Sequence, residues 1–330
     1  MKLASLNCGT ADGQLVLVSR DLSVMVDASD IAPTMQYALE HWDSCVPFLQ
    51  ARYQQLNSDS LSNAQPFRSE QVLAPLPRSW QWLDGSCFLQ HGHLMQQAFH
   101  LEPIADADKI PLVYQGAGDS FCGANASLFV AQAQHGADFE GEFGVITGDL
   151  PVGATPEQAF QAIRLVTLLN DISYRALAPR EMKTGFGFVQ AKGPTAFAPV
   201  AVTPDELGDA WHNARVCLPV HVHRNEQPFG QPDGAEMHFG FDQLISHVAV
   251  TRPIKAGSVF GSGTVSNANP NVGQACISEL RAKEMIATGK PQTPFLSAGE
   301  TVSIEVFAAD GQSVFGQIRQ SVTVGENLHV

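Results

Sequence analysis

The chain has 330 residues, of which 44% are hydrophobic and only 16% are charged, and its formal net charge is −14. This acidic balance argues against a nucleic-acid-binding protein, which carries a basic patch or stripe, and against docking on anionic lipid. The apolar content is that of an ordinary globular protein, and the length allows about two domains. No window approaches the ~20 apolar residues that a membrane helix requires.

Residues 1–75 are expected to form a small N-terminal domain. Two strand-like apolar runs come first, at 15–18 and 23–26. Apolar residues then recur with helical spacing over 31–56, which predicts a helix. The polar, serine-rich stretch 57–68 is typical of a linker and would end this domain.

Residues 76–330 are expected to form a larger domain in which short strands predominate. A capping threonine, a proline and a glutamine at 155–158 predict a helix that continues over 159–169. Thr203 and Pro204 predict a second, short helix ending near Asp209. Further strands are predicted at 218–223, 258–260, 301–307 and 313–319. The pattern favours a strand-rich α+β fold over alternating βαβ units.

The densest acidic feature is the stretch Asp138 to Phe143, which contains Glu140 and Glu142. On a strand, residues two apart project from the same face. Two neighbouring carboxylates repel each other unless a cation lies between them, and hard oxygen ligands suit Mg²⁺, Mn²⁺ or Ca²⁺. The spacing alone also fits the solvated face of an edge strand, so both interpretations stay open at this point.

Other polar residues have equally ordinary explanations when they are taken singly. Asp171 follows the predicted helix and is typical of a helix-ending turn. Lys192, among few lysines, would usually be a solvated charge. The pair His221 and His223 shares a strand face, which is more often a surface feature than a metal site. His91 and His93 have the same spacing and leave the same two possibilities.

Cysteine usage and the start of the sequence both bear on the cellular compartment. No C-x-x-C motif or zinc-finger spacing occurs among the six widely separated cysteines Cys8, Cys45, Cys87, Cys122, Cys217 and Cys276. They are therefore expected to be reduced thiols. The first fourteen residues contain no apolar run of the signal-peptide kind, so we expect a cytoplasmic protein.

Four strings in order make the chain resemble the fumarylacetoacetate hydrolase family. They are DFEGEFGVITGD at 138–149, NDISYRAL at 170–177, FGFVQAKGPTAFAPV at 186–200 and GSVFGSGTVSN at 257–267. They match the family's glutamate-x-glutamate strand, its Asn-Asp-x-Ser-x-Arg stretch, its lysine-bearing strand and its glycine loop. The opening also resembles the N-terminal domain of a bacterial subgroup. The resemblance implies a rolled β-structure core behind a small N-terminal domain.

In this family carboxylates hold a divalent metal ion, and the resemblance assigns that role to Glu140, Glu142 and Asp171. Asp84 stands seven residues before His91, the spacing of a fourth ligand and a catalytic histidine in fumarylacetoacetase-like members. His91 would be the general base. His93 is the alternative, because the family's usual sequence around the catalytic histidine does not occur here.

The resemblance also assigns residues around the metal. Glu279 resembles the glutamate that partners the histidine, although the segment 276–288 could be helical by composition. Arg175 and Lys192 are expected to take part in both catalysis and substrate binding. Tyr114 and Thr264 match substrate-contacting positions.

At several substrate-contacting positions, this chain departs from the pattern of fumarylacetoacetase-like members. Ala178 and Met182 stand near a glutamine and a tyrosine, Ala117 replaces an arginine, and Ser86 replaces a tyrosine beside the metal aspartate. The metal chemistry is therefore better supported than the identity of the substrate.

The resemblance implies hydrolysis of a carbon–carbon bond in a small 1,3-diketo acid. Fumarylacetoacetate, cleaved to fumarate and acetoacetate in tyrosine catabolism, is the first expectation, and the expected cofactor is Mg²⁺, with Ca²⁺ or Mn²⁺ as alternatives. Another acylpyruvate hydrolase or an oxaloacetate decarboxylase is possible on the same scaffold. A non-catalytic metal-binding dimer is the alternative from a different class. The family commonly forms homodimers, and a homodimer is expected here.

Overall fold

The computed structural model describes residues 1–58 and 60–325. Residue 59, in the predicted linker, and residues 326–330, at the end of the predicted second domain, lie outside the described residues. The helices are α1 (Met35–Glu40), α2 (Trp42–Leu56), α3 (Leu89–Phe99), α4 (Pro156–Ala162), α5 (Ala178–Thr184), α6 (Phe241–Val248) and α7 (Ile277–Thr288). Short 3₁₀ turns are η1 (Ser69–Gln71), η2 (Ala133–His135), η3 (Pro204–Ala210), η4 (Gly234–Glu236) and η5 (Pro270–Val272).

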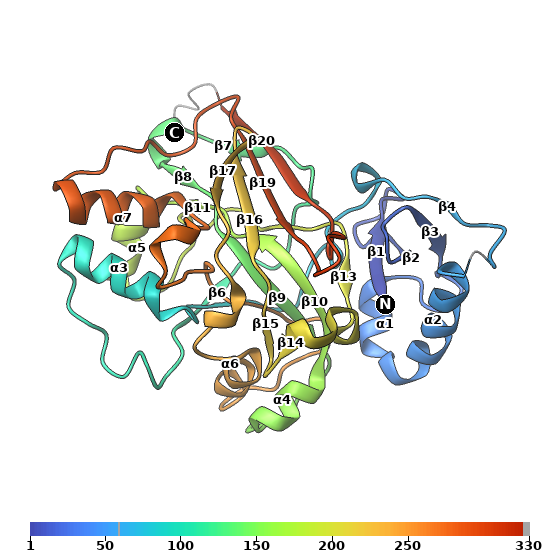
Figure 1. The fold of residues 1–330 in the computed structure, drawn as a ribbon. Helices are drawn as coiled ribbons and strands as arrows, with labels where there is room; N and C mark the ends of the chain where they lie inside the picture. Colours follow the sequence, from blue (N-terminus) through green and yellow to red (C-terminus); the bar gives the residue numbers. More distant parts are fainter. Residues whose placement is uncertain (59, 326–330) are drawn as a thin grey trace.

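One large sheet runs through the molecule in the order β4-β3-β2-β1-β13-β10-β9-β18-β5-β6, with β12 also paired to β10. Its strands are β1 (Lys2–Leu6), β2 (Gln14–Val18), β3 (Val24–Asp27), β4 (Gln65–Pro66), β5 (Trp82–Gly85), β6 (Val113–Gly116), β9 (Gly141–Thr147), β10 (Ile163–Asn170), β12 (Ala196–Phe197), β13 (Ala201–Val202) and β18 (Val259–Gly261). The strand-rich α+β fold class is therefore confirmed, and Figure 1 shows how the sheets and helices are arranged.

A second sheet has five strands in the order β17-β16-β19-β20-β7. They are β7 (Leu128–Val130), β16 (Val220–Arg224), β17 (Gln227–Gly230), β19 (Thr301–Val306) and β20 (Ile318–Val324). Two small pairs join β8 (Ala137–Asp138) to β11 (Ser173–Tyr174) and β14 (Trp211–His212) to β15 (Arg215–Val216). Buried side chains of the five-stranded sheet, such as Val222 and Ile304, share a core with Phe143 and Leu168 of the large sheet. The two sheets thus pack through one apolar layer.

The predicted N-terminal domain, residues 1–75, is joined to the rest of the chain by the large sheet. Its first strand pairs with β13, with Lys2 opposite Val202 and Leu3 opposite Ala201. Its helices α1 and α2 lie with these strands at one end of the molecule (Figure 1). Their buried residues form a cluster that also contains Trp82, from the larger part of the chain. The N-terminal strands therefore extend the central sheet.

The helix predicted over 159–169 begins correctly but is wrong from Ile163 onward. Thr155 and Gln158 form the predicted capping box, and α4 ends at Ala162. The chain then continues as β10, whose residues from Leu165 to Asn170 are all buried. A strand that lies between two others and under a second sheet needs apolar residues on both faces. Its sequence is therefore continuously apolar and lacks the alternation of apolar and polar residues that usually indicates a strand.

Smaller differences concern where elements begin and end. The helix predicted over 31–56 is divided into α1 and α2 at His41. The strand predicted at 313–319 starts only at Ile318, where β20 pairs with β19 and β7. The segment 276–288 is indeed helical and forms α7. Among the described residues, no helix is long and apolar enough to cross a membrane.

Candidate metal centre and active site

Three of the four predicted acidic ligands meet at one end of adjacent strands. Asp84 lies on β5, Glu142 lies on β9, and Asp171 directly follows β10. In the sheet, β9 pairs with β10 on one side and with β18 on the other, and β18 pairs with β5. One carboxylate oxygen from each of the three side chains lies within 4.8 Å of the other two. We refer to Asp84, Glu142 and Asp171 as the carboxylate cluster.

The three carboxyl groups of the carboxylate cluster are buried, and their partners differ. Neither oxygen of Glu142 has a hydrogen-bond donor among the described residues. Burial, followed by the neighbouring Asp84 carboxylate, raises the pKa of the Glu142 carboxyl well above its usual value. Burial and the Asp171 carboxylate likewise raise the pKa of Asp84 to about 8. Three buried and mutually close carboxyl groups offer hard oxygen ligands to a divalent cation, so the donor set fits the expected metal.

The glycine loop after β18 leaves room for the Asp84 carboxylate. The backbone N–H of Gly263 donates to Asp84 Oδ1 over 3.0 Å. Gly263 has a φ of +75°, in the left-handed region that favours glycine. A Cβ atom at Gly261 would lie 2.3 Å from Asp84 Oδ1. The two glycines therefore let the backbone approach a buried carboxylate closely.

Lys192 links the carboxylate cluster to the fourth predicted ligand. Its Nζ lies 2.5 Å from Asp171 Oδ2 and 3.1 Å from Glu140 Oε1. The hydroxyl of Tyr114 also donates to Asp171 Oδ2, over 2.5 Å, and Lys192 Nζ lies 5.1 Å from the centre of the Tyr114 ring. Thr195 donates to the other oxygen of Asp171. Lys192 is thus a largely buried cation at the site, with 12% of its side chain exposed, rather than a solvated charge.

Glu140 lies beside the carboxylate cluster but its oxygens are engaged elsewhere. Ser173 donates to Oε1 over 2.7 Å, and Thr264 donates to Oε2 over 2.5 Å. Arg175 Nη2 lies 2.7 Å from Oε1. Burial would raise the pKa of the Glu140 carboxyl, but Arg175 and Lys192 hold it well below its usual value. The structure does not place Glu140 in the group of close donor atoms, and its role as a ligand stays a prediction.

His91 and Glu279 form the predicted pair. His91 lies on α3 and Glu279 on α7, two helices that pack side by side (Figure 1). His91 Nδ1 lies 2.8 Å from Glu279 Oε1, and Glu279 is buried. A carboxylate only accepts, so Nδ1 carries the proton and Nε2 is left as the basic nitrogen. His93, two residues along the same helix, is exposed.

Asp138 connects this pair to the acidic site, a role that sequence reasoning missed. Its carboxylate accepts N–H groups from Ile277, over 2.7 Å, and Ser278, over 2.9 Å, at the first turn of α7. It also accepts from Arg175 Nε over 2.9 Å. Because Arg175 also contacts Glu140, Asp138 fixes the helix of Glu279 relative to the metal-binding side of the site.

Replacing Asp138 with Asn should therefore impair the His91–Glu279 pair. The amide keeps one accepting oxygen but presents N–H groups in place of the other, so at least one donor of Ile277, Ser278 and Arg175 loses its acceptor. We expect unfolding to become easier by about 3–5 kcal/mol, as for other broken buried pairs. Turnover should fall by about 10–100-fold, the usual effect of losing a group that orients a site. Thermal unfolding, metal content and turnover of the same sample measure these effects.

Glu284→Gln is the matched control for this variant. Glu284 lies on the same helix and accepts N–H groups from Gln292 and Thr293 at its other end. This variant should lose stability with little change in turnover per folded molecule. Wild-type turnover in Asp138→Asn would contradict the positioning role.

Other residues of the site were also absent from the predictions. They are Ser173, Thr195, Phe188, which packs edge-on against the Tyr114 ring, and Cys276, which directly precedes α7. Ser173 stands in the quoted Asn-Asp-x-Ser-x-Arg stretch and could have been found there. Phe188 and Thr195 likewise stand in the quoted lysine-bearing string, whereas Cys276 comes close to the site only through the fold.

His221 and His223 lie on β16, in the five-stranded sheet, and neither is among the groups of close metal-ligand atoms in the described part of the chain. His221 packs edge-on against Phe307. Replacing both histidines with Gln should leave turnover within a few-fold of wild type. A steady-state assay of the double variant tests this expectation, and a loss of about a hundredfold would place the β16–β17 hairpin in the site.

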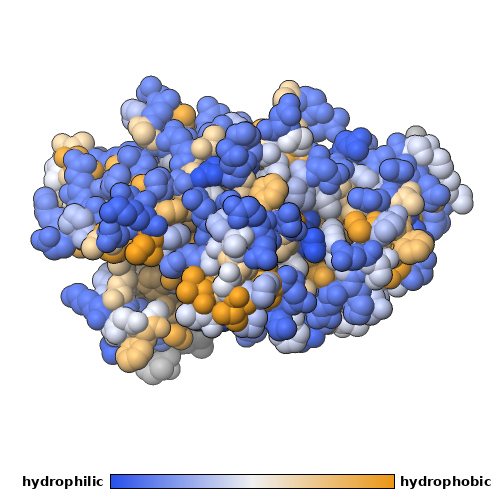
Figure 2. Space-filling view, turned by 90° about the horizontal axis from the view of Figure 1, so that it is seen from below, coloured by the Kyte–Doolittle hydropathy of each residue, from blue (hydrophilic) through white to orange (hydrophobic). Residues whose placement is uncertain are grey.

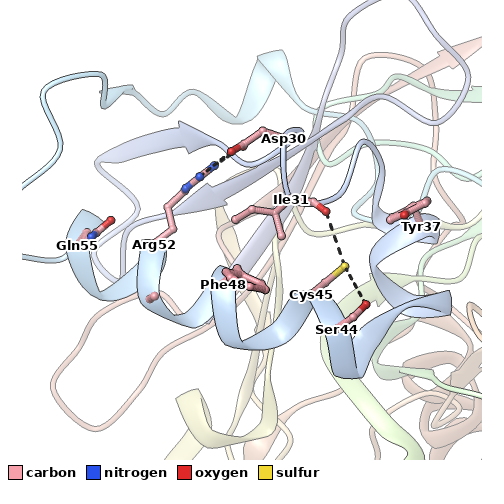
Figure 3. A pocket seen from close by; sticks show the side chains of 9 residues that line it. Asp30, Ile31, Tyr37, Ser44, Cys45, Phe48, Arg52 and Gln55 are labelled. Carbon is pink, nitrogen blue, oxygen red and sulfur yellow. Dashed lines mark hydrogen bonds and ion pairs between the residues drawn. The ribbon is translucent and has the colours of Figure 1, made fainter.

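A surface hollow of about 530 Å³ lies elsewhere, on the N-terminal domain (Figure 3). It is lined by α2 and by the loop of Asp30 and Ile31, and Arg52 forms an ion pair with Asp30. Phe48 is exposed there. No residue of the proposed site contributes to it. The face seen from below in Figure 2 is mostly hydrophilic, with scattered apolar areas.

Two family models match the chain. "Fumarylacetoacetate (FAA) hydrolase C-terminal" matches residues 81–323, and "Fumarylacetoacetase N-terminal domain 2" matches residues 1–78. The chain therefore belongs to the fumarylacetoacetate hydrolase family, and the resemblance found in the sequence is confirmed. It has the scaffold of this family of hydrolases and isomerases.

Two relatives named as a hydrolase or putative hydrolase each match about two thirds of the chain or less. A 2,4-didehydro-3-deoxy-L-rhamnonate hydrolase from Sphingomonas sp. (strain SKA58) is 26% identical over 221 residues, 66% of this chain and 67% of that protein. A Burkholderia ambifaria protein is 25% identical over 201 residues, and the match spans only 62% of its length.

Solved structures share the fold at low identity. Maleylpyruvate hydrolase from Sphingobium sp. SYK-6, in complex with manganese(II) and pyruvate, superposes with a TM-score of 0.66 at 14% identity, covering 99% of this chain and 100% of that one. A 2-hydroxyhepta-2,4-diene-1,7-dioate isomerase from Mycobacterium marinum gives 0.61 at 15% identity, with the same coverage.

Proposed function

We propose that this protein is a metal-dependent hydrolase that cleaves a carbon–carbon bond of a small 1,3-diketo acid. The observation that carries the proposal is the carboxylate cluster, three buried and mutually close carboxyl groups, together with the His91–Glu279 pair. A non-catalytic metal-binding protein would need the cluster alone. A partly exposed histidine paired with a buried glutamate is what a water-activating enzyme requires.

Asp84, Glu142 and Asp171 would hold the metal ion, for which Mg²⁺ is our first choice and Mn²⁺ or Ca²⁺ are alternatives. Glu140 is a further proposed ligand. When bound, the cation would supply Lewis-acid polarisation of the substrate's carbonyl groups. The raised pKa values of Asp84 and Glu142 are lowered again when a cation neutralises the carboxylates.

His91 would act as the general base. With Nδ1 directed to Glu279, its Nε2 takes a proton from water, and the resulting hydroxide adds to a carbonyl carbon. The bond between this carbon and the neighbouring CH₂ carbon then breaks, and its electron pair leaves as an enolate. The proton held by His91 returns to the enolate carbon. Water is thus divided between a carboxylic acid and a ketone product.

The cationic side chains of the site would complement the charge of the substrate. Lys192 and Arg175 are both positioned by buried carboxylates, so their charges face the site without needing to reorganise. Tyr114 and Thr264 donate hydroxyl hydrogen bonds to Asp171 and Glu140. We propose that both hydroxyls also contact the substrate when it is bound.

Fumarylacetoacetate, which would give fumarate and acetoacetate, is the first proposed substrate. An acylpyruvate is a second candidate, and two observations favour it. The substrate positions occupied by Ser86, Ala117, Ala178 and Met182 depart from the fumarylacetoacetase pattern. The structural relative with manganese(II) and pyruvate is a maleylpyruvate hydrolase. Oxaloacetate decarboxylation remains a third possibility on this scaffold.

A substrate panel tests the proposal directly. Fumarylacetoacetate, two acylpyruvates and oxaloacetate should be assayed after chelator treatment and again after Mg²⁺ or Mn²⁺ is added back. We expect hydrolysis of at least one diketo acid, lost with chelator and restored by metal. Full turnover in a demonstrably metal-free sample would refute the proposal. We also propose a cytoplasmic homodimer, for which light scattering of the purified protein is the test of the oligomeric state.

A further inference from the structure

Next to the carboxylate cluster lies a second group of potential metal ligands with different chemistry. A ring nitrogen of His91, the sulfur of Cys276 and a carboxylate oxygen of Glu279 all lie within 4.8 Å of one another. Cys276 and Glu279 are buried, and the His91 side chain is 21% exposed. We refer to these three residues as the soft-donor cluster.

The place of Cys276 in the fold does not account for its side chain. Cys276 occupies the N-cap position of α7, where a side chain usually accepts from the first turn, but its side chain makes no such bond. Asp138, from another part of the chain, accepts those N–H groups instead. The thiol is therefore directed toward His91 and Glu279 and makes no capping contact.

We propose that the soft-donor cluster is an inhibitory binding site for Zn²⁺. Imidazole, thiolate and carboxylate are the ligands that zinc takes in proteins, and three of them leave a fourth position open. The carboxylate cluster offers only oxygen, which suits Mg²⁺, Mn²⁺ or Ca²⁺. The two clusters therefore differ in the cations they select, although they belong to one site.

Zinc at this position would stop the reaction by occupying the base. Zinc on Nδ1 of His91 would displace Glu279 from this nitrogen, the ring proton would move to Nε2, and the proton of the Cys276 thiol would be released to solvent. With zinc on Nδ1 and the proton on Nε2, the imidazole has no free nitrogen that could take a proton from water. The inhibitory effect rests on the proposed function, whereas zinc binding itself does not.

The binding test uses the full-length protein with saturating Mg²⁺, so that the carboxylate cluster is filled. Equilibrium dialysis should give one further bound Zn²⁺ per chain. Co²⁺ in place of zinc should produce the intense absorption of a thiolate ligand. Cys276→Ser and Cys276→Ala should lose the cobalt absorption and weaken zinc binding by more than the ~10–100-fold typical of losing an outer-shell partner.

Cys45→Ser is the matched control, because Cys45 is also buried but lies on α2, in the N-terminal domain. It should keep the cobalt absorption of the wild type. In the kinetic arm, zinc should inhibit the wild type and Cys45→Ser alike, and the two Cys276 variants should need at least ~10-fold more zinc, each compared with its own uninhibited rate. Zinc binding and cobalt absorption unchanged in both Cys276 variants would overturn the proposal. If no diketo acid is hydrolysed, dialysis and cobalt absorption still decide whether the zinc site exists.

Discussion

Glu142→Gln should abolish most of the stabilisation that a divalent cation gives to this protein. In the wild type, a cation that binds only the folded state adds about 2.7 kcal/mol at a hundred times its dissociation constant. The variant removes one of the three carboxylates of the carboxylate cluster, the one whose two oxygens have no hydrogen-bond donor among the described residues. Its metal-dependent rise in unfolding temperature should therefore be much smaller, and turnover should fall by at least ~10–100-fold. Thermal unfolding at several Mg²⁺ and Mn²⁺ concentrations measures the first effect.

The same variant should behave in the opposite way without metal. A buried carboxyl group that lacks a donor destabilises the fold, and the amide of Gln can donate to the neighbouring Asp84 or Asp171 carboxylate. Metal-free Glu142→Gln should thus unfold at or above the wild-type temperature. Asp149→Asn serves as the control, because Asp149 follows the same strand but is exposed at its far end. An equal metal-induced shift in Glu142→Gln and the wild type would remove Glu142 from the proposed ligands.

The acidic site could be anticipated from the sequence, but the different surroundings of Glu140 and Glu142 could not. Strand spacing indicates that Glu140 and Glu142 project alike. The partners that separate them come from distant segments: Arg175 and Thr264 engage Glu140, whereas Glu142 is left facing Asp84. Segments more than thirty residues away in sequence therefore decide that the arginine and lysine side chains contact Glu140 and not Glu142.

The two histidines of α3 show how the type of secondary structure decides a functional assignment. On a strand, His91 and His93 would share a face, and spacing alone could not separate them. On a helix, two residues apart means roughly 200° of rotation, so one side chain turns toward α7 and the other toward solvent. The resemblance supplied the preference for His91, and the contact with Glu279 supports it.

The buried strand β10 and the roles of Asp138 and Cys276 could not be predicted from the sequence. The text from Ile163 to Asn170 is apolar on both faces, which gives the same local signal as a buried helix. Asp138 and Cys276 gain their roles only where α7 approaches β8, about 140 residues along the chain. Local pattern reasoning finds residues with unusual chemistry, but it cannot find an ordinary residue that the fold places beside them.

His91→Ala should lose at least ~10²-fold in diketo-acid turnover, because general-base catalysis is typically worth ~10²–10⁴-fold. It should keep its Mg²⁺ or Mn²⁺, since the imidazole is not part of the carboxylate cluster. Glu279→Gln should show a milder loss, because the amide orients the imidazole less firmly than the carboxylate does. His93→Ala is the matched control on the same helix, and its exposed side chain should be dispensable. Metal content and turnover are measured on the same samples.

Assaying the same variants with oxaloacetate separates hydrolysis from decarboxylation. Decarboxylation needs no attacking water, so Lys192 and the metal would carry most of the barrier lowering and His91→Ala would lose little. A large loss with the diketo acid combined with a small loss with oxaloacetate is the expected pattern for a hydrolase. Near-wild-type hydrolysis in His91→Ala would refute the base assignment, and a large loss confined to His93→Ala would move that role two residues along α3. Only hydrolysis requires a base that is oriented by Glu279. Comparing the two substrates therefore tests the role of the His91–Glu279 contact as well as the type of reaction.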